Sequence, residues 1–420
     1  MKTLIKNIQQ IVGVSNQPTH TIKKGKAMNE ISTVENGWIM IENDIISDYG
    51  NMDTWKGIDD WNHLNIIDAN NGIVLPTWCD SHTHIVYAGT REEEFLDRIN
   101  GYSYEEIAKN GGGILNSAKL LSKTSEKNLY KQASQRLKKL IKLGTGAIEI
   151  KSGYGLNTKD EIKMLRVIKR LKKEYPIPIK STFLGAHATP QEYSQANYIS
   201  VIINEMIPEI AKQRLADYID VFCDKGFFTA NETEQILEAG IKYGLKPKIH
   251  ANELDFSGGI QVGVKMNALT VDHLECTGEE EINLLKQSTT IPTLLPGTAH
   301  FLNLEYPPAR QMIDSGLGIA IASDHNPGSC PSGNIATMIS LACIKMKLTP
   351  IEAINATTIN GAFAMEINNI TGEITKGKKA NLIITKEIPS INYIPYSMGE
   401  NNIEKVIING KIYDDSETNY

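Results

Sequence analysis

The segment IVLPTWCDSHTH at residues 73–84 decides the fold that this chain is expected to adopt. It begins as an apolar run typical of a buried strand and ends in two histidines separated by one residue. Side chains two residues apart on a strand point to the same face, so His82 and His84 are expected to face one interior together. Two imidazoles placed in this way can bind one ion, and imidazole suits zinc and iron.

Seven further strand-like runs follow, and helix-length amphipathic segments separate most of them. The runs are GAIEIKSGYG (146–155), IKSTFLGAHA (179–188), YIDVFCDKG (218–226), KPKIHANEL (246–254), ALTVDHLE (268–275), TIPTLLPGT (290–298) and GIAIASDHNPG (318–328). One intervening segment, 229–244 and the residue after it, places four apolar residues on an expected helical face: Ile236, Leu237, Ile241 and Leu245. Eight strands alternating with helices predict an α/β fold, a (β/α)8 TIM-like barrel, which usually takes about 250 residues.

The two ends of the chain resemble each other more than either resembles the middle. Residues 1–72 and 367–420 contain short β segments broken by Gly, Asn and Asp. We therefore expect a small, discontinuous β-sandwich domain formed from both termini. Residues 73–366 are then the inserted barrel domain.

Composition excludes several classes of protein. At 420 residues the chain fits one large barrel with a minor domain. The net charge of -6 argues against a nucleic-acid partner, because phosphate recognition needs a basic face. No stretch approaches the roughly 20 apolar residues that span a bilayer, and the N-terminus does not resemble a signal peptide, so no membrane partner is expected. The 5 scattered cysteines, without a CxxC pair, favour free thiols in a reducing, cytoplasmic location.

Polar residues capable of chemistry stand at the ends of the strand-like runs. They are His82, His84, Tyr154, His187, Asp224, His250, His273 and Asp324. Barrel enzymes build their active sites at the C-terminal ends of the strands. These side chains are therefore expected to converge on one mouth of the barrel.

His250 and Asp324 complete an expected metal site with His82 and His84. A catalytic metal needs about three protein ligands and an open position for water. Taken singly, His250 could be a hydrogen-bonded core histidine and Asp324 a helix cap, but together with the paired histidines they favour a metal. His325 is expected to point away from Asp324 and is not among the expected ligands.

Several motifs, in continuous order from about residue 70 to 366, resemble the imidazolonepropionase family of the amidohydrolase superfamily. DSHTH followed by a late-strand aspartate resembles the superfamily as a whole. The likeness to the narrower family is carried by YAGTREEEFLDRINGYSYEEIAKNGGGI (87–114), EIKSGYGL (149–156), TFLGAHA (182–188), YIDVFCDKGFFT (218–229), KIHANEL (248–254), DHLE (272–275), LLPGTAHFL (294–302) and SDHNPGSCPSGN (323–334). Agreement is weaker in both terminal β segments.

The resemblance implies a reaction and a cofactor. Members of that family hydrolyse the cyclic amide of 4-imidazolone-5-propanoate to N-formimidoyl-L-glutamate, in histidine degradation, with one transition metal per subunit, Zn2+ or Fe3+. Asp324 would hold the attacking water and carry its proton, with Glu253 as a second candidate base, and His273 would polarise the carbonyl. Relatives with two metals carry a carboxylated lysine at the end of the fourth strand, where this chain has Asp224, and Lys151 lies on the second run instead. One metal is therefore expected.

The small-molecule substrate carries a propionate group, for which a guanidinium offers two parallel donors. Arg91, in the first loop after the paired histidines, is the expected partner, although it could instead be a surface residue paired with Glu92 to Glu94. The resemblance also implies substrate contacts for Tyr154, His187, Glu253, Asn326, Gly328 and Ser329. Tyr102 could touch substrate or pack in the core, and the role of His300 stays open.

Two other functions remain to be weighed. A deaminase acting on a purine or pyrimidine ring would share the metal ligands but would have no need for Arg91. A barrel that serves only as a binding or scaffold protein would be expected to lack a metal ligand. Barrel enzymes with a β side domain commonly pair, so a homodimer is expected.

Overall fold

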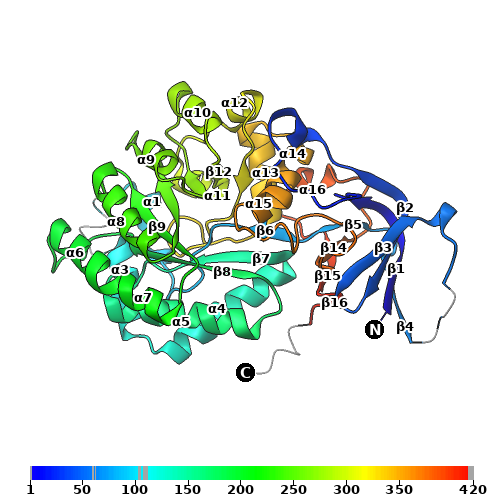
Figure 1. Cartoon of the computed structure of the whole chain (residues 1–420), viewed down its shortest axis with the longest axis horizontal. Coiled ribbons are helices and arrows are strands. Elements are labelled where there is room, and N and C mark those ends of the chain that lie inside the picture. The colour runs from blue at the N-terminus through cyan, green and yellow to red at the C-terminus, as the bar shows by residue number, and fades with distance from the viewer. Residues whose placement is uncertain (1, 59–60, 62, 103–105, 107–111, 415–420) are drawn as a thin grey trace.

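The computed structural model describes residues 2–58, 61, 63–102, 106 and 112–414. Two sheets organise these residues, and Figure 1 shows the barrel beside a sheet built from the blue and red ends of the chain. The predicted barrel and the predicted β unit of both termini are confirmed.

The barrel sheet contains 8 parallel strands that neighbour one another in sequence order. They are β6 (Trp78–Asp80), β7 (Thr145–Lys151), β8 (Ile179–Ala186), β9 (Tyr218–Cys223), β10 (Lys246–Ala251), β11 (Thr270–His273), β12 (Ile291–Leu294) and β13 (Ala320–Ile321). A parallel bridge between Thr83 and His325, just after β6 and β13, closes the ring. The Asp324 amide donates to the His82 carbonyl at 3.0 Å across the same seam. Closure therefore brings expected ligands from the first and last strands together.

Helices follow the strands and cover the outside of the barrel (Figure 1). They are α1 (Glu92–Ile99), α3 (Gly113–Lys123), α4 (Glu126–Lys142), α5 (Thr158–Glu174), α6 (Gln195–Val201), the π-helical turn η3 (Ile202–Met206), α7 (Ile207–Gln213), α8 (Ala230–Lys242), α9 (Gly259–Lys265), α10 (Glu279–Lys286), α11 (Pro296–Leu302), α12 (Ala309–Asp314), α13 (Ile335–Met346), α14 (Pro350–Thr357) and α15 (Ile359–Phe363). No helix among these described segments is long and apolar enough to cross a membrane.

Helix α8 shows how local sequence sets these boundaries. Thr229 and Glu232 form a reciprocal capping box at its start. Of the apolar residues expected on one helical face, Ile236 is fully buried, whereas Ile241 is 41% exposed. Gly240 lies against the strand instead: a Cβ there would come within 2.6 Å of Ile219. The buried face is thus turned toward the glycine.

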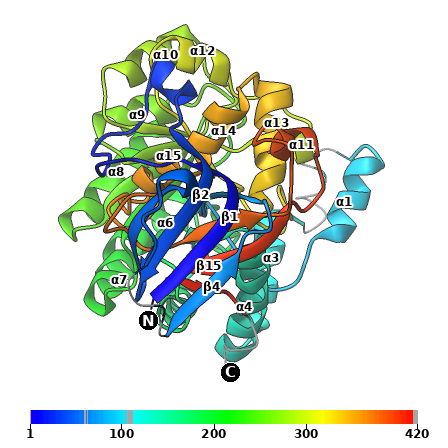
Figure 2. The same cartoon turned by 90° about the vertical axis from the view of Figure 1, so that its right-hand side faces the viewer.

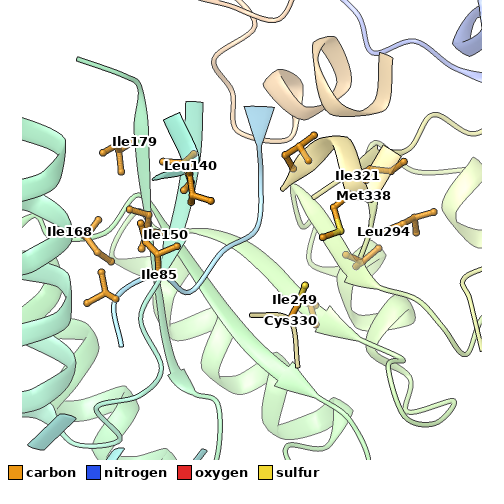
Figure 3. Close-up of a cluster of buried hydrophobic side chains, with 14 of the residues drawn as sticks. Ile85, Leu140, Ile150, Ile168, Ile179, Ile249, Leu294, Ile321, Cys330 and Met338 are labelled. Atoms are coloured by element: carbon orange, nitrogen blue, oxygen red, sulfur yellow. The ribbon is translucent and has the colours of Figure 1, made fainter. Parts of the chain in front are cut away.

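Alternation along the strands separates two environments. Ile150 on β7 belongs to the large apolar cluster that also contains Leu140 of α4 and Ile168 of α5, and Figure 3 shows these side chains between strand and helices. Glu149 and Lys151, on either side of Ile150, point to the opposite face and are also fully buried. The apolar core therefore lies outside the strands, and the barrel interior holds charge.

The terminal sheet also has 8 strands, and both ends of the chain contribute to it. They are β1 (Lys2–Val12), β2 (Thr33–Glu42), β3 (Ile45–Asn51), β4 (Leu64–Asp68), β5 (Ile73–Pro76), β14 (Leu382–Thr385), β15 (Ile403–Ile408) and β16 (Lys411–Ile412), with short helices η1 (Gly25–Asn29), η2 (Met52–Thr54) and α16 (Tyr393–Tyr396) between them. The first residues of β1 pair with β4, and Gln10 and Ile11 pair with β5, so β1 joins the two parts of the expected sandwich in one connected sheet (Figure 2). A separate apolar cluster fills this unit.

The run 73–84, expected as one strand, is in fact two strands in different sheets. β5 pairs with β14, whose Ile384 lies opposite Val74, and the barrel begins at Trp78. Pro76 ends β5, and the chain passes from one sheet to the other at Thr77. The domain division at residue 73 remains a prediction, and these pairings favour a first boundary near residue 77.

Candidate active site

The expected metal ligands converge inside the mouth of the barrel. The Nε2 atom of His84 lies 3.2 Å from Nε2 of His82 and 3.4 Å from Nε2 of His250. The Oδ1 atom of Asp324 lies 3.4 Å from Nε2 of both His82 and His84. All four side chains are buried. Three imidazole nitrogens and a carboxylate oxygen facing one another form a donor set that suits a transition metal.

Asp324 is held so that one oxygen faces the histidines. It follows β13 in a left-handed backbone conformation, with φ +52°. The Thr298 hydroxyl donates to Oδ2 at 2.6 Å, which leaves Oδ1 toward His82 and His84. Burial raises the pKa of the carboxyl group to about 6, against the opposing effect of the Thr298 hydrogen bond.

Buried carboxylates lie against the far side of two of the imidazole rings. Nδ1 of His82 lies 2.6 Å from Oδ2 of Asp272, and Nδ1 of His250 lies 3.0 Å from Oδ2 of Asp220. Burial, together with the nearby Lys151 cation, holds the pKa of His82 well below its usual value. A neutral ring that donates from Nδ1 presents the Nε2 lone pair to a metal. Neither aspartate was expected from the sequence.

His273 and two glutamates form a second group beside the ligands. The His273 ring centroid is 5.2 Å from that of His250. Its Nδ1 lies 3.6 Å from Glu253 and 3.8 Å from Glu275. Burial and the neighbouring Asp324 raise the pKa of Glu253 well above its usual value, and burial and Glu253 do the same for Glu275. This arrangement favours retention of a proton beside His273. Glu275 was missed, although it closes the DHLE motif.

Two aromatic residues form one wall next to the ligands. The His187 ring stacks on His84 at 5.4 Å between centroids, and the Tyr154 ring lies 5.3 Å from that of His187. Nδ1 of His187 lies 2.9 Å from the Gly153 carbonyl oxygen. Gly153 has φ +110°, and a Cβ there would lie 2.8 Å from that ring nitrogen, so the turn requires glycine.

Arg91 lies at the start of α1, and its side chain is 5% exposed. Its Nε and Nη2 atoms approach one Glu94 oxygen at 2.8 and 2.7 Å, and the other Glu94 oxygen accepts from the Gly113 amide at 2.9 Å. The guanidinium also lies against Gly328, where a Cβ would be only 2.2 Å from Nη1. Arg91 does pair with a neighbouring glutamate, but in a buried position and not at the surface.

Asn326 organises the loop after β13. Its amide donates to the Asp324 carbonyl and to the Ser329 hydroxyl, both at 2.7 Å. Its side-chain oxygen, Oδ1, accepts from the backbone amides of Gly328 at 2.8 Å and Ser329 at 2.7 Å. These bonds occupy the side chain within the loop itself. Ser329 reaches back to Oδ2 of Asp324 at 3.4 Å.

The remaining residues singled out in the sequence lie outside the ligand cluster. The Tyr102 side chain is 48% exposed, and His300 pairs with the Tyr306 hydroxyl at 3.1 Å. Asp224 accepts from the Leu254 amide at 2.8 Å and so ties together the loops after β9 and β10. His325 turns toward Tyr87, with 6.3 Å between ring centroids.

Comparison with known proteins identifies the family of this chain. The model of the amidohydrolase family matches residues 73–413. An imidazolonepropionase from Flavobacterium johnsoniae is 56% identical over 414 residues, covering 98% of this chain and 100% of the relative. One from Christiangramia forsetii is 54% identical, with the same coverage.

Solved structures give the fold independently. A guanine deaminase from C. acetobutylicum with guanine in its active site superposes with a TM-score of 0.71 at 18% identity, covering 98% of this chain and all of that one. At that identity the likeness concerns the fold alone. The family match and the full-length relatives establish more, and the chain belongs to the amidohydrolase family and, within it, to the imidazolonepropionases.

Proposed function

We propose that this chain hydrolyses 4-imidazolone-5-propanoate to N-formimidoyl-L-glutamate, a step of L-histidine degradation. The observation that carries the proposal is the buried set of three histidines and Asp324 with the Arg91 cation held in the loops above it. The names of the relatives, which are similar over almost the whole chain, support the same substrate.

The proposed chemistry divides among the residues of the site. His82, His84, His250 and Asp324 would hold one Zn2+ or Fe3+ ion, which supplies Lewis-acid activation of water and of the substrate carbonyl when bound. Asp324 takes the proton of the attacking water and passes it to the ring nitrogen as the C–N bond breaks. Glu253 is the alternative base, and in that role Glu275 rather than Glu253 would be the proton donor to His273.

His273 is proposed to donate a hydrogen bond from Nε2 to the carbonyl oxygen as negative charge develops there. In the neutral ring this requires the proton on Nε2, and Nδ1 then accepts a hydrogen bond. The raised pKa values of Glu253 and Glu275, both close to Nδ1, favour a protonated carboxyl group that can donate to it. The two glutamates would thereby fix the tautomer that catalysis requires.

The substrate would lie between the ligands and the loops. Arg91 binds the propionate through its planar donors, and Tyr154 and His187 line the ring. Gly328 permits close approach, while Asn326 and Ser329 keep the loop in shape beside Asp324.

Replacing Gly328 by alanine is expected to raise KM about 10-fold with a small change in kcat, because one strong hydrogen bond to a charged group contributes about 1.5 kcal/mol. The added Cβ would overlap the Arg91 guanidinium, which would have to shift from its place beside Glu94. Steady-state kinetics would measure the effect. In an Arg91→Ala background, the same change should leave KM unaltered; a further increase there would contradict this explanation.

Turnover of imidazolone propionate, combined with metal analysis of the same preparation, tests the proposed function. We expect hydrolysis together with about one zinc or iron ion per chain. Turnover of guanine or cytosine in place of imidazolone propionate would favour the deaminase alternative, whose four ligands are the same. Absence of every activity with metal bound would favour a binding protein.

We also propose a homodimer in the cytoplasm. The five cysteines are all unpaired, which is typical of proteins in reducing compartments. Sedimentation equilibrium of the purified chain would measure the number of subunits.

A further inference from the structure

Five charged side chains lie inside the barrel, beneath the candidate metal site, and take no part in the chemistry proposed above. They are Glu149, Lys151, Asp220, Lys248 and Asp272, on strands β7, β9, β10 and β11, and none is more than 1% exposed. Burying charge is costly unless each group has a partner. A cluster of this kind, immediately below the ligands, therefore calls for a specific role.

Lys151 is the residue that joins this cluster. Its Nζ atom lies 2.7 Å from Glu149, 2.8 Å from Oδ2 of Asp220 and 3.4 Å from Oδ2 of Asp272. Burial alone would lower the pKa of the lysine, but these three carboxylates together raise it above its usual value. The Lys151 side chain is thus a permanent cation that lies between the carboxylates of Glu149, Asp220 and Asp272.

The two aspartate oxygens that Lys151 contacts are the same atoms that lie within 3.0 Å of the imidazole Nδ1 atoms. Oδ2 of Asp272 also lies against Nδ1 of His82, and Oδ2 of Asp220 lies against Nδ1 of His250. The Lys151 ammonium group therefore contacts both aspartates, and through them it is linked to His82 and His250, two expected ligands that are far apart in the sequence. Without it, two carboxylates would be left close together in a buried space, and their repulsion would turn both away from the rings.

We propose that Lys151 is a positioning residue that, through Asp272 and Asp220, holds Nε2 of both His82 and His250 toward the metal. The inference rests on the metal site of the proposed function. Lys151 does not contact the ligands itself, and its role differs from that of the carboxylated lysine that bridges two metals in some relatives.

Lys248 offers a matched control. It is as deeply buried as Lys151 and carries the same charge, but among the described carboxylates it contacts only Glu149. Its other polar contact is the Ser81 carbonyl, at 3.4 Å. Lys248→Met removes a cation from the cluster but keeps Lys151, the cation in contact with Asp220 and Asp272. Methionine nearly preserves the volume in both variants.

The experiment measures the Zn2+ dissociation constant of each folded variant by competition with a chelator. Lys151→Met is expected to weaken binding about 10- to 100-fold, the usual effect of losing a group that orients a metal ligand. Lys248→Met should stay within about threefold of the wild type. Equal weakening in both variants would mean a general effect of charge, and no weakening in Lys151→Met would mean no positioning; either result overturns the inference.

A second measurement needs neither metal nor a stable Lys151→Met protein. Nitrogen-15 shifts of the metal-free wild type should assign the proton of both His82 and His250 to Nδ1, and Lys151→Gln should lose this preference. A wild-type proton on Nε2 in either ring, or unchanged tautomers in Lys151→Gln, would overturn the inference. Failure of the wild type to bind metal would count instead against the proposed function.

Discussion

Replacing His82 by alanine is expected to lower kcat/KM by at least about 10^3-fold and to leave the protein with far less than one metal ion per chain. His82 Nε2 lies within 3.4 Å of both His84 Nε2 and Asp324 Oδ1, so its loss opens the centre of the donor set. It also leaves Asp272 without the ring that it holds. Metal content and steady-state kinetics of the same preparation would measure both effects.

His325→Gln is the control for loss of a buried histidine near the site. His325 is adjacent to Asp324 in sequence, but its ring lies toward Tyr87 and outside the ligand cluster. Metal content in that variant should stay close to that of the wild type. Full metal occupancy and normal turnover in His82→Ala would show that the metal is held elsewhere.

The barrel and its mouth could be predicted because two regular features occur together in the sequence: the alternation of strand-like and helical segments, and a polar residue at the end of most strand-like runs. Strand-like runs alternate with amphipathic segments, and the polar end of each run marks the side on which the loops meet. The ring closes next to Thr83 and His325, so Asp324 becomes a neighbour of His82 and His84, which precede it by 242 and 240 residues. Convergence of His82, His84, His250 and Asp324 follows from that topology.

What could not be predicted depends on contacts between strands deeper in the barrel. Asp220 and Asp272 look like ordinary interior residues of β9 and β11, and only the folded barrel shows that they contact His250 and His82. Inward alternation along β7 could have drawn attention to Glu149. The passage of the chain from β5 in the terminal sheet to β6 in the barrel was also not predicted. A single apolar run does not indicate which sheet each of its halves joins.

The buried face of α8 shows a related limit. A helical spacing that includes Ile241 is as regular as the one that is actually buried. Close approach at Gly240 decides between them, because the helix rests on Ile219 where no side chain intervenes. Packing against a specific partner, which periodicity does not contain, thus sets the rotation of the helix.

Arg91→Ala is expected to reduce kcat/KM for imidazolone propionate by about 10^2- to 10^3-fold, mainly through KM, because two charge-assisted hydrogen bonds to the propionate contribute about 3 to 4 kcal/mol. Glu94 and Gly328 hold the guanidinium in place before any substrate binds, so little ordering of the side chain is needed. Arg91→Lys should recover only part of the loss, since an ammonium lacks the planar pair of donors.

The corresponding propanamide separates substrate binding from a structural effect of the same substitution. Loss of Arg91 leaves Glu94 buried with the Gly113 amide as a remaining partner, so some loss of stability is expected as well. A misfolded site would lose activity toward the acid and the neutral amide alike. A missing carboxylate clamp would instead penalise the acid selectively, because the amide presents no negative charge to the guanidinium. Equal losses for both substrates would therefore assign Arg91 to the structure of the loop, and a loss confined to the acid would assign it to recognition of the propionate.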